Sequence, residues 1–120
     1  MANCSESSII VDDFHQKRIY RITVDGELNF NNHHEFSGII SGLISKDIYR
    51  IIVDFSRLAA IDSVGIGVLI KYQKLMQGNN GEMVIIGARE QIMDLFIPIN
   101  LNKILTFFRT LDEGLRYLSV

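Results

Sequence analysis

Hydrophobic and polar residues alternate along the first part of the chain with a period of two, which predicts β-strands. In residues 18–24, Tyr20, Ile22 and Val24 alternate with more polar neighbours. A shorter apolar run begins at residues 9–11, and residues 14–17 are suited to a chain reversal. These segments therefore predict a β-hairpin whose second strand ends at residues 25–27.

Four later segments have the spacing of helices. An apolar stripe predicts a first helix, with Asn31 or Asn32 as its cap and Glu35 three residues after Asn32 in capping-box position. The stripe comprises Phe36, Ile39, Ile40, Leu43 and Ile44. A second helix is expected over residues 63–77, and a third, over residues 89–96, ends before Pro98. Thr110 and Glu113 form a capping box that opens a C-terminal helix. The inward stripe of the second helix comprises Gly65, Val68, Leu69, Tyr72, Leu75 and Met76.

Apolar runs without alternation separate these helices. Residues 49–55 and 83–86 are continuous enough to predict strands buried deep in a sheet, and residues 104–107 predict a final strand. Strands that alternate with helices after an initial hairpin are typical of an α/β domain with a mixed sheet.

Composition restricts the class of protein. The 120 residues suffice for one domain with a core, and 48% hydrophobic with 22% charged residues is typical of globular proteins. The 12 basic and 14 acidic residues are spread along the chain and give a formal charge of -2. They form no basic stripe that would favour direct nucleic-acid binding. Cys4 is alone, which excludes an internal disulfide.

No signal peptide or apolar run of membrane-spanning length is apparent, so we expect no membrane span and a cytoplasmic protein. Residues 1–8 are expected to form a flexible tail and residues 9–120 the domain.

The polar pair Asp62-Ser63 stands where a buried strand region leads into the second helix. A serine at the start of a helix lies beside backbone N–H groups without intrahelical partners, which also favour a phosphate. Gly65 and Gly67 would let a second protein approach the first turn closely. Alternatively, Ser63 is a simple helix cap and Asp62 a turn residue.

The run Asp62-Ser63-Val64-Gly65-Ile66-Gly67 resembles the D-S-[ST]-G-[LI]-G signature of STAS domains, the family of bacterial anti-sigma factor antagonists. Residues 26–28 are similar to the G-[ED]-L-D element of that family, and residues 53–56 to its strand-ending [IV]-D-[LF]-[ST] element. The order of elements from Arg18 to Leu118 agrees, so the resemblance covers most of the chain.

The resemblance implies a single STAS-like domain with a mixed sheet of four to five strands and helices mainly on one face. It implies that Ser63 is phosphorylated and that the protein is a non-enzymatic switch without a cofactor. Unphosphorylated, it would bind an anti-sigma factor of the serine-kinase type and release a sigma factor, and a serine phosphatase would restore it. The candidate partner-binding residues are Gly26, Glu27, Leu28, Asn29, Asp62, Ser63, Val64, Gly65, Ile66, Gly67 and Ile70, of which Ile66 and Ile70 follow from their place on the helix rather than from the resemblance.

Two positions depart from the family pattern. Val64 replaces a frequent second hydroxyl residue, which leaves Ser63 as the single hydroxyl in the motif, and Asn29 stands where an aspartate is usual. Ile66 and Ile70 fall outside the inward stripe of the second helix. They form either an apolar patch for partner binding or a packing contact under a neighbouring segment.

Two other functions compete with the switch. The domain could be a structural subunit of a signalling or lipid-transport complex, without phosphorylation. A small enzyme is disfavoured, since no phosphate-binding loop of P-loop spacing and no Ser-His-Asp motif is recognisable. No metal is expected, because the adjacent His33 and His34 have no third ligand at metal-binding spacing.

Overall fold

The computed structural model describes residues 8–14 and 18–119. In this part of the chain, the order of the sheet is β1-β2-β3-β5-β6, and β4 pairs with β2 beside this path. The strands are β1 (Ser8–Phe14), β2 (Ile19–Leu28), β3 (Arg50–Asp54), β4 (Leu58–Ile61), β5 (Glu82–Ile86) and β6 (Thr106–Phe108). Among the strands in residues 8–14 and 18–119, only β1 runs antiparallel to its neighbour, so the sheet is mixed, as predicted.

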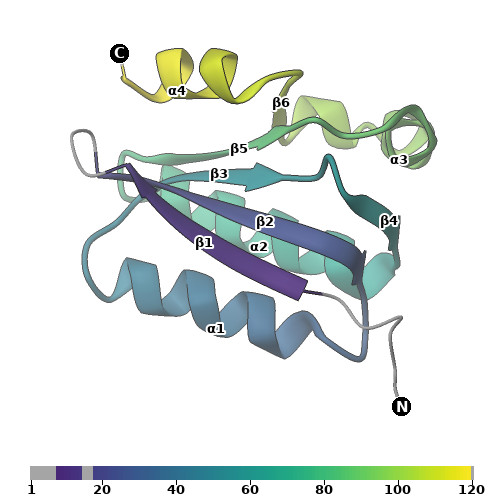
Figure 1. The fold of residues 1–120 in the computed structure, drawn as a ribbon, viewed down its shortest axis with the longest axis horizontal. Helices are drawn as coiled ribbons and strands as arrows, with labels where there is room; N and C mark the ends of the chain where they lie inside the picture. Colours follow the sequence, from purple (N-terminus) through teal and green to yellow (C-terminus); the bar gives the residue numbers. More distant parts are fainter. Residues whose placement is uncertain (1–7, 15–17, 120) are drawn as a thin grey trace.

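Helices lie on both faces of the sheet, with the larger layer on one side (Figure 1). The helices are α1 (His33–Ile44), α2 (Ser63–Gln77), α3 (Glu90–Phe96) and α4 (Leu111–Ser119), and two short 3-10 segments span Ile97–Ile99 and Leu101–Lys103. Helices α1 and α2 cover one face, and α4 lies against the other (Figure 1). The predicted α/β domain with helices mainly on one face is confirmed.

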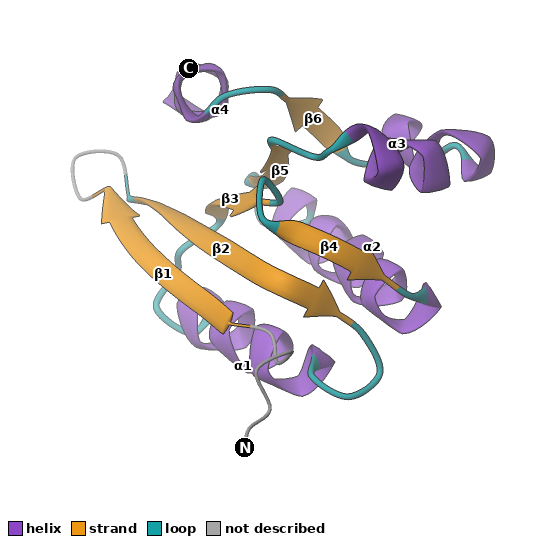
Figure 2. Cartoon of the chain, turned by 45° about the vertical axis from the view of Figure 1, so that its right-hand side comes forward, coloured by secondary structure: helices purple, strands orange, loops and turns teal. Residues whose placement is uncertain are grey.

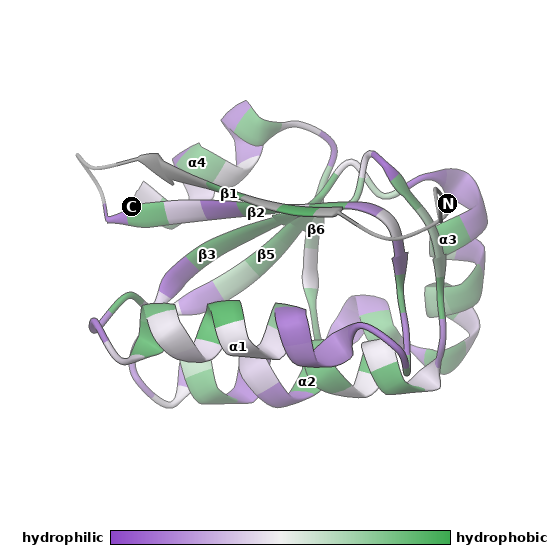
Figure 3. Ribbon diagram, turned by 60° about the horizontal axis from the view of Figure 1, so that its bottom comes forward, coloured by the Kyte–Doolittle hydropathy of each residue, from purple (hydrophilic) through white to green (hydrophobic). Residues whose placement is uncertain are grey.

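Two apolar clusters hold these layers together. The larger joins α1, α2 and α3 to the sheet, and it includes Phe36, Ile51 and Leu69, all of them fully buried. The smaller joins α4 to the other face, through Ile52 and Leu118 among others. Figure 3 shows β3 and β5 as hydrophobic strands between the helical layers. Residues 51–53 are therefore covered on both faces, as their continuous apolar run predicts.

Most predicted element boundaries agree with the structure. The hairpin, the apolar stripe of α1, and the bounds of α2 are confirmed, and the last strand begins two residues later than predicted. The capping box of α4 is also confirmed, since the Glu113 N–H donates to Thr110 Oγ1 at 3.2 Å and the Thr110 N–H to Glu113 Oε1 at 3.2 Å. Residues 1–7 and 15–17, expected to belong to a tail and a turn, lie outside the described residues.

The predicted end of the second strand at residues 25–27 is wrong. Strand β2 continues to Leu28, because its last residues pair with β4, a strand that sequence reasoning missed. The pairing register shifts between Gly26 and Glu27, and Gly26 has a φ of 108°, a conformation that strongly favours glycine. The bulge and its glycine let the strand turn toward β4 without ending.

Two predictions about helices are also wrong. Asn32 precedes α1 but makes no capping hydrogen bond with its side chain, which is used in the turn before the helix. In α2 the inward face includes Gln73, whereas Leu75 is 42% exposed. Gln73 is drawn inward because its Oε1 accepts a hydrogen bond from the Met83 N–H of β5 at 2.8 Å.

Candidate functional site

The ends of β2 and β4 lie side by side, and each strand leads through a short connection into a helix (Figure 2). Leu28 is paired with Ile61 at this point. Asp62 and Ser63 follow β4 directly, while residues 29–32 connect β2 to α1. The two segments singled out in the sequence, residues 26–29 and 62–67, are therefore neighbours in the folded chain.

The Asp62 carboxylate connects these segments. Asp62 Oδ1 accepts a hydrogen bond from the Gly65 N–H at 3.0 Å, which caps α2. Asp62 Oδ2 accepts one from the Phe30 N–H, also at 3.0 Å. The backbone N–H of Gly65, followed by that of Phe30, lowers the pKa of Asp62 below its ordinary value, because these bonds favour the charged form. The carboxylate is therefore held ionised and in place.

Ser63 is the first residue of α2, and its side chain is exposed. Its hydroxyl makes no hydrogen bond to any residue that the structure describes. The alternative interpretation of Ser63 as the helix cap is thus wrong, because Asp62 supplies the capping oxygen. The hydroxyl remains available to an external group, next to the N-terminal end of a helix of 15 residues.

The two glycines of the motif have different environments. A Cβ atom at position 65 would lie 2.6 Å from the Leu28 carbonyl oxygen and 2.8 Å from Ile61 Cγ1, so Gly65 permits close contact between α2 and the two strand ends. A Cβ atom at position 67 would have no heavy atom within 4 Å. Approach of a second protein is therefore open at Gly67, whereas the space at Gly65 is already taken within the chain.

The other candidate residues on α2 have side chains that are partly buried and partly exposed to solvent. Val64, Ile66 and Ile70 are half-buried, and both isoleucines pack against the larger core cluster. The parts of these side chains that remain accessible flank the exposed Ser63 and Gly67. Ile66 and Ile70 therefore make a packing contact within the chain, and the remainder of each side chain is apolar surface open to solvent.

The candidate residues of β2 are part of the sheet rather than of a loop. Leu28 is fully buried, so its side chain belongs to the core and is not exposed to a partner. Gly26 and Glu27 are half-buried, and Glu27 Oε1 accepts a hydrogen bond from Asn29 Nδ2 at 2.7 Å. Asn29 thus uses its amide, which an aspartate would lack, to fix its own side chain.

Phe30 is a site residue that sequence reasoning missed. Its side chain is 69% exposed, and its backbone N–H is bound to Asp62. The available signal was an aromatic residue in a run of asparagines, where turn chemistry predicts exposure.

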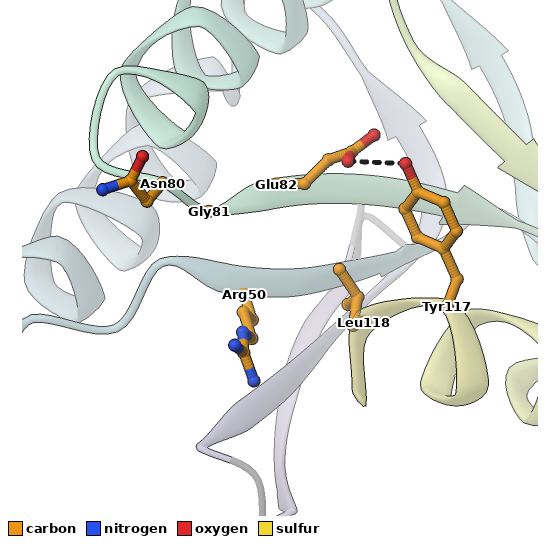
Figure 4. A pocket seen from close by; sticks show the side chains of 6 residues that line it. All are labelled: Arg50, Asn80, Gly81, Glu82, Tyr117 and Leu118. Carbon is orange, nitrogen blue, oxygen red and sulfur yellow. Dashed lines mark hydrogen bonds between the residues drawn. The ribbon is translucent and has the colours of Figure 1, made fainter. Parts of the chain in front are cut away.

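A cavity of about 360 Å³ lies at the opposite end of the sheet, where β3 and β5 begin. Figure 4 shows the Tyr117 hydroxyl bonded to Glu82, at 2.7 Å from Oε1. This bond raises the pKa of Tyr117, and the Thr106 hydroxyl donates to the other carboxylate oxygen of Glu82. Both oxygens of Glu82 therefore join α4 and β6 to β5.

In residues 8–14 and 18–119, no three His, Cys, Asp or Glu residues gather as a metal site requires, and the rings of His33 and His34 lie 4.0 Å apart. Within the same ranges, no helix has the length and apolar character needed to cross a membrane.

Comparison with known proteins gives a consistent match. The model of the STAS domain family matches residues 12–114. The anti-sigma-B factor antagonist of Staphylococcus aureus (strain NCTC 8325 / PS 47) is 26% identical over 81 residues, which cover 68% of this chain and 75% of that protein.

Solved structures show the same fold at low sequence identity. An anti-sigma factor antagonist from Mycobacterium paratuberculosis superposes with a TM-score of 0.83 at 18% identity, covering 98% of both chains. The anti-sigma factor antagonist SpoIIAA in its unphosphorylated form gives a TM-score of 0.78 at 18% identity, covering 94% of this chain and 98% of that one. The phosphorylated form of SpoIIAA from Bacillus gives 0.71 at 19% identity, covering 92% and 98%.

Proposed function

Because the chain belongs to the STAS domain family, we propose that it is an anti-sigma factor antagonist whose binding is controlled by phosphorylation of Ser63. In this proposal the unphosphorylated chain binds an anti-sigma factor of the serine-kinase type in the cytoplasm, and the sigma factor is released. The kinase then phosphorylates Ser63 with ATP, and a serine phosphatase restores the binding form.

The exposed Ser63 hydroxyl is the observation that carries this proposal. It is free of hydrogen bonds within the described residues, and it stands on a helix end that the Asp62 carboxylate has already capped. A kinase can therefore reach the oxygen without first breaking a contact of the fold. The open space at Gly67, one turn further along α2, also favours close approach.

Phosphorylation would change the surface more than the fold. The phosphate adds about -1.5 to -2 charges and three acceptor oxygens beside Asp62. The N-terminal dipole of α2 compensates part of this charge within the chain. A partner surface that fits the unmodified serine would have to desolvate or repel the phosphate. The expected result is an intact domain that no longer binds its partner.

The catalytic groups in this scheme belong to the partners. The kinase supplies the nucleotide site and the base that activates the hydroxyl, and the phosphatase supplies its own hydrolytic centre. The chain itself contributes a substrate serine and a binding surface. Asp62 then has a positioning role, because both of its oxygens are engaged by backbone N–H groups.

Reconstitution with the anti-sigma factor kinase of the same organism tests the proposal. Purified chain, kinase and ATP are incubated, and phosphate is located by peptide mass spectrometry. We expect phosphate at Ser63 in the wild type and in Ser56→Ala, a control in which another exposed serine is removed, and none in Ser63→Ala.

Binding is then measured with the same kinase. A chain carrying phosphoserine at position 63 should bind at least about tenfold more weakly than the unmodified chain, a change of about 1.4 kcal/mol. Ser63→Ala should bind as the wild type does. Equal affinity of the phosphorylated and unmodified chains would contradict the switch and favour a constitutive binding subunit.

A further inference from the structure

Among the residues that the structure describes, Phe30 has the most exposed large hydrophobic side chain, at 69%. An isolated exposed hydrophobic residue is common on protein surfaces and needs no special explanation. The position of Phe30 is unusual for two further reasons, which concern the rigidity of its backbone and its link to Ser63.

The turn that carries Phe30 is held by hydrogen bonds on both sides. The Asn31 N–H donates to Asn29 Oδ1 at 2.9 Å, and the Asn29 N–H donates to Asn32 Oδ1 at 2.8 Å. Asn32 Nδ2 also donates to the carbonyl oxygen of Glu27 at 2.6 Å. The backbone around Phe30 is therefore fixed before any partner arrives, which lowers the entropic cost of using this side chain in an interface.

The Asp62 carboxylate ties the backbone of Phe30 to the first turn of α2, the turn in which Ser63 lies. Asp62 Oδ2 accepts from the Phe30 N–H, and Asp62 Oδ1 accepts from the N–H of Gly65 in the first turn of α2. The turn that carries the exposed Phe30 and the helix end that carries the exposed Ser63 are thus bound to one carboxylate. Ile66 is half-buried and lies three residues after Ser63 on α2, a spacing at which side chains are neighbours on a helix.

We propose that Phe30 is the aromatic anchor of the interface with the anti-sigma factor, and that it inserts into an apolar pocket of that partner. This inference rests on the function proposed above. Buried aromatic residues dominate the energy of many interfaces when they lie near the centre and are surrounded by contacts that exclude water. A phosphate on Ser63 would then have to be desolvated in the same interface, beside this anchor.

The affinity of the purified anti-sigma factor kinase for Phe30→Ala tests the inference. Loss of an anchoring aromatic side chain should weaken binding by about 30-fold or more. Leu75→Ala is the matched control, because Leu75 is 42% exposed on α2 and lies 12 positions, or roughly 18 Å, along the helix from Ser63. This control should bind as the wild type does, and all three chains should unfold at the same urea concentration.

A photocrosslinking residue gives a readout of proximity that does not depend on affinity. We expect p-benzoylphenylalanine at position 30 to crosslink to the kinase in the unphosphorylated complex, and the same residue at position 75 not to. Crosslinking at position 30 should disappear once Ser63 is phosphorylated.

The possible outcomes separate this inference from the proposed function. If the wild type binds the kinase and is phosphorylated at Ser63, while Phe30→Ala binds within threefold of it and position 30 does not crosslink, the anchor is wrong and the switch stands. If the wild type neither binds the kinase nor accepts phosphate, both are overturned. Selective loss of binding in Phe30→Ala, with crosslinking at position 30, supports both.

Discussion

At the scale of single residues, Asp62 connects parts of the molecule that are distant in the sequence. Its carboxylate binds the first turn of α2 and the Phe30 N–H, and its own N–H donates to the Leu28 carbonyl oxygen at 3.3 Å. The end of β2, the turn after it and the start of α2 therefore depend on one side chain and its backbone. A substitution at Asp62 will change the shape of the site as well as its charge.

The stability of the protein should depend on the ionisation of Asp62. The pKa of Asp62 is lowered in the fold from its ordinary 3.8, so its contribution to stability is present above that value and is lost as the pH falls through the lower folded-state pKa. Urea unfolding at pH 5 and pH 2.5 measures this. We expect Asp62→Asn to lose less stability over this range than the wild type or the control Asp94→Asn, and an identical loss in all three would contradict the assignment.

The hydroxyl groups of Ser63 and Thr110 should differ in their effect on stability. Thr110 Oγ1 accepts the capping hydrogen bond of α4, whereas the Ser63 hydroxyl has no hydrogen bond within the described residues. Urea unfolding of Thr110→Ala should show a loss of about 1 kcal/mol, and that of Ser63→Ala a change within about 0.5 kcal/mol. A large loss in Ser63→Ala would indicate a structural role for the hydroxyl.

At the scale of elements, the approach of α2 to the strand ends determines the geometry of the site. Gly65 is buried against Leu28 and Ile61, at the point where β2 pairs with β4. The contact sets how far the first turn of α2, and with it Ser63, stands from the turn that carries Phe30. The packing of α2 against the ends of β2 and β4 therefore controls the distance between Ser63 and Phe30.

Alanine substitutions at the two glycines of α2 should have opposite effects. A methyl group at position 65 must displace the Leu28 backbone or the helix, and we expect Gly65→Ala to lose about 1 to 3 kcal/mol of stability. Gly67→Ala adds a methyl group in open space within a helix, and it should gain about 0.5 to 1 kcal/mol. Thermal unfolding of both variants checks this, and equal effects would contradict the close contact at Gly65.

Local patterns in the sequence were sufficient for most elements but not for those that depend on distant partners. The stripe of α1 and the capping box at Thr110 involve residues within a few positions of one another. Strand β4 forms only because β2 bends at Gly26 and pairs with it, and Gln73 faces inward only because β5 offers an N–H. Neither contact can be predicted from the spacing of apolar residues within a short segment, because its two partners are distant in the sequence.

The candidate site was predicted in part for the same reason. The motif at residues 62–67 identified the position of Ser63 at the start of a helix, which the structure confirms. The pairing of β2 with β4, which brings Phe30 to Asp62, crosses more than 30 residues of chain and could not be deduced from spacing.

Considering the whole molecule, Ser63 lies at one end of the sheet and belongs to neither core cluster. Of the candidate residues, buried Leu28 belongs to the larger cluster, and half-buried Ile66 and Ile70 pack against it. A charge added at Ser63 therefore enters solvent rather than the core. Phosphorylation can then change what the domain binds without changing how it folds.

Phosphorylation should leave the fold of the isolated domain intact. We expect the chain with phosphoserine at position 63 to keep the circular dichroism spectrum of the unmodified chain, with an unfolding free energy that differs by no more than about 1 kcal/mol. The dipole of α2 favours the phosphate and Asp62 opposes it, so the two effects offset each other in part. Unfolding of the domain on phosphorylation would replace the surface switch with a conformational one.

The occupancy of phosphate at Ser63, in the cells that produce this protein, tests the proposed switch. Phosphopeptide mapping of the chain recovered during growth and under stress measures it, with Ser56 as an internal comparison on the same molecule. We expect an occupancy at Ser63 that changes with condition while Ser56 remains unmodified. A Ser63 that stays unphosphorylated in every condition would contradict it, and the chain would then be a constitutive binding subunit.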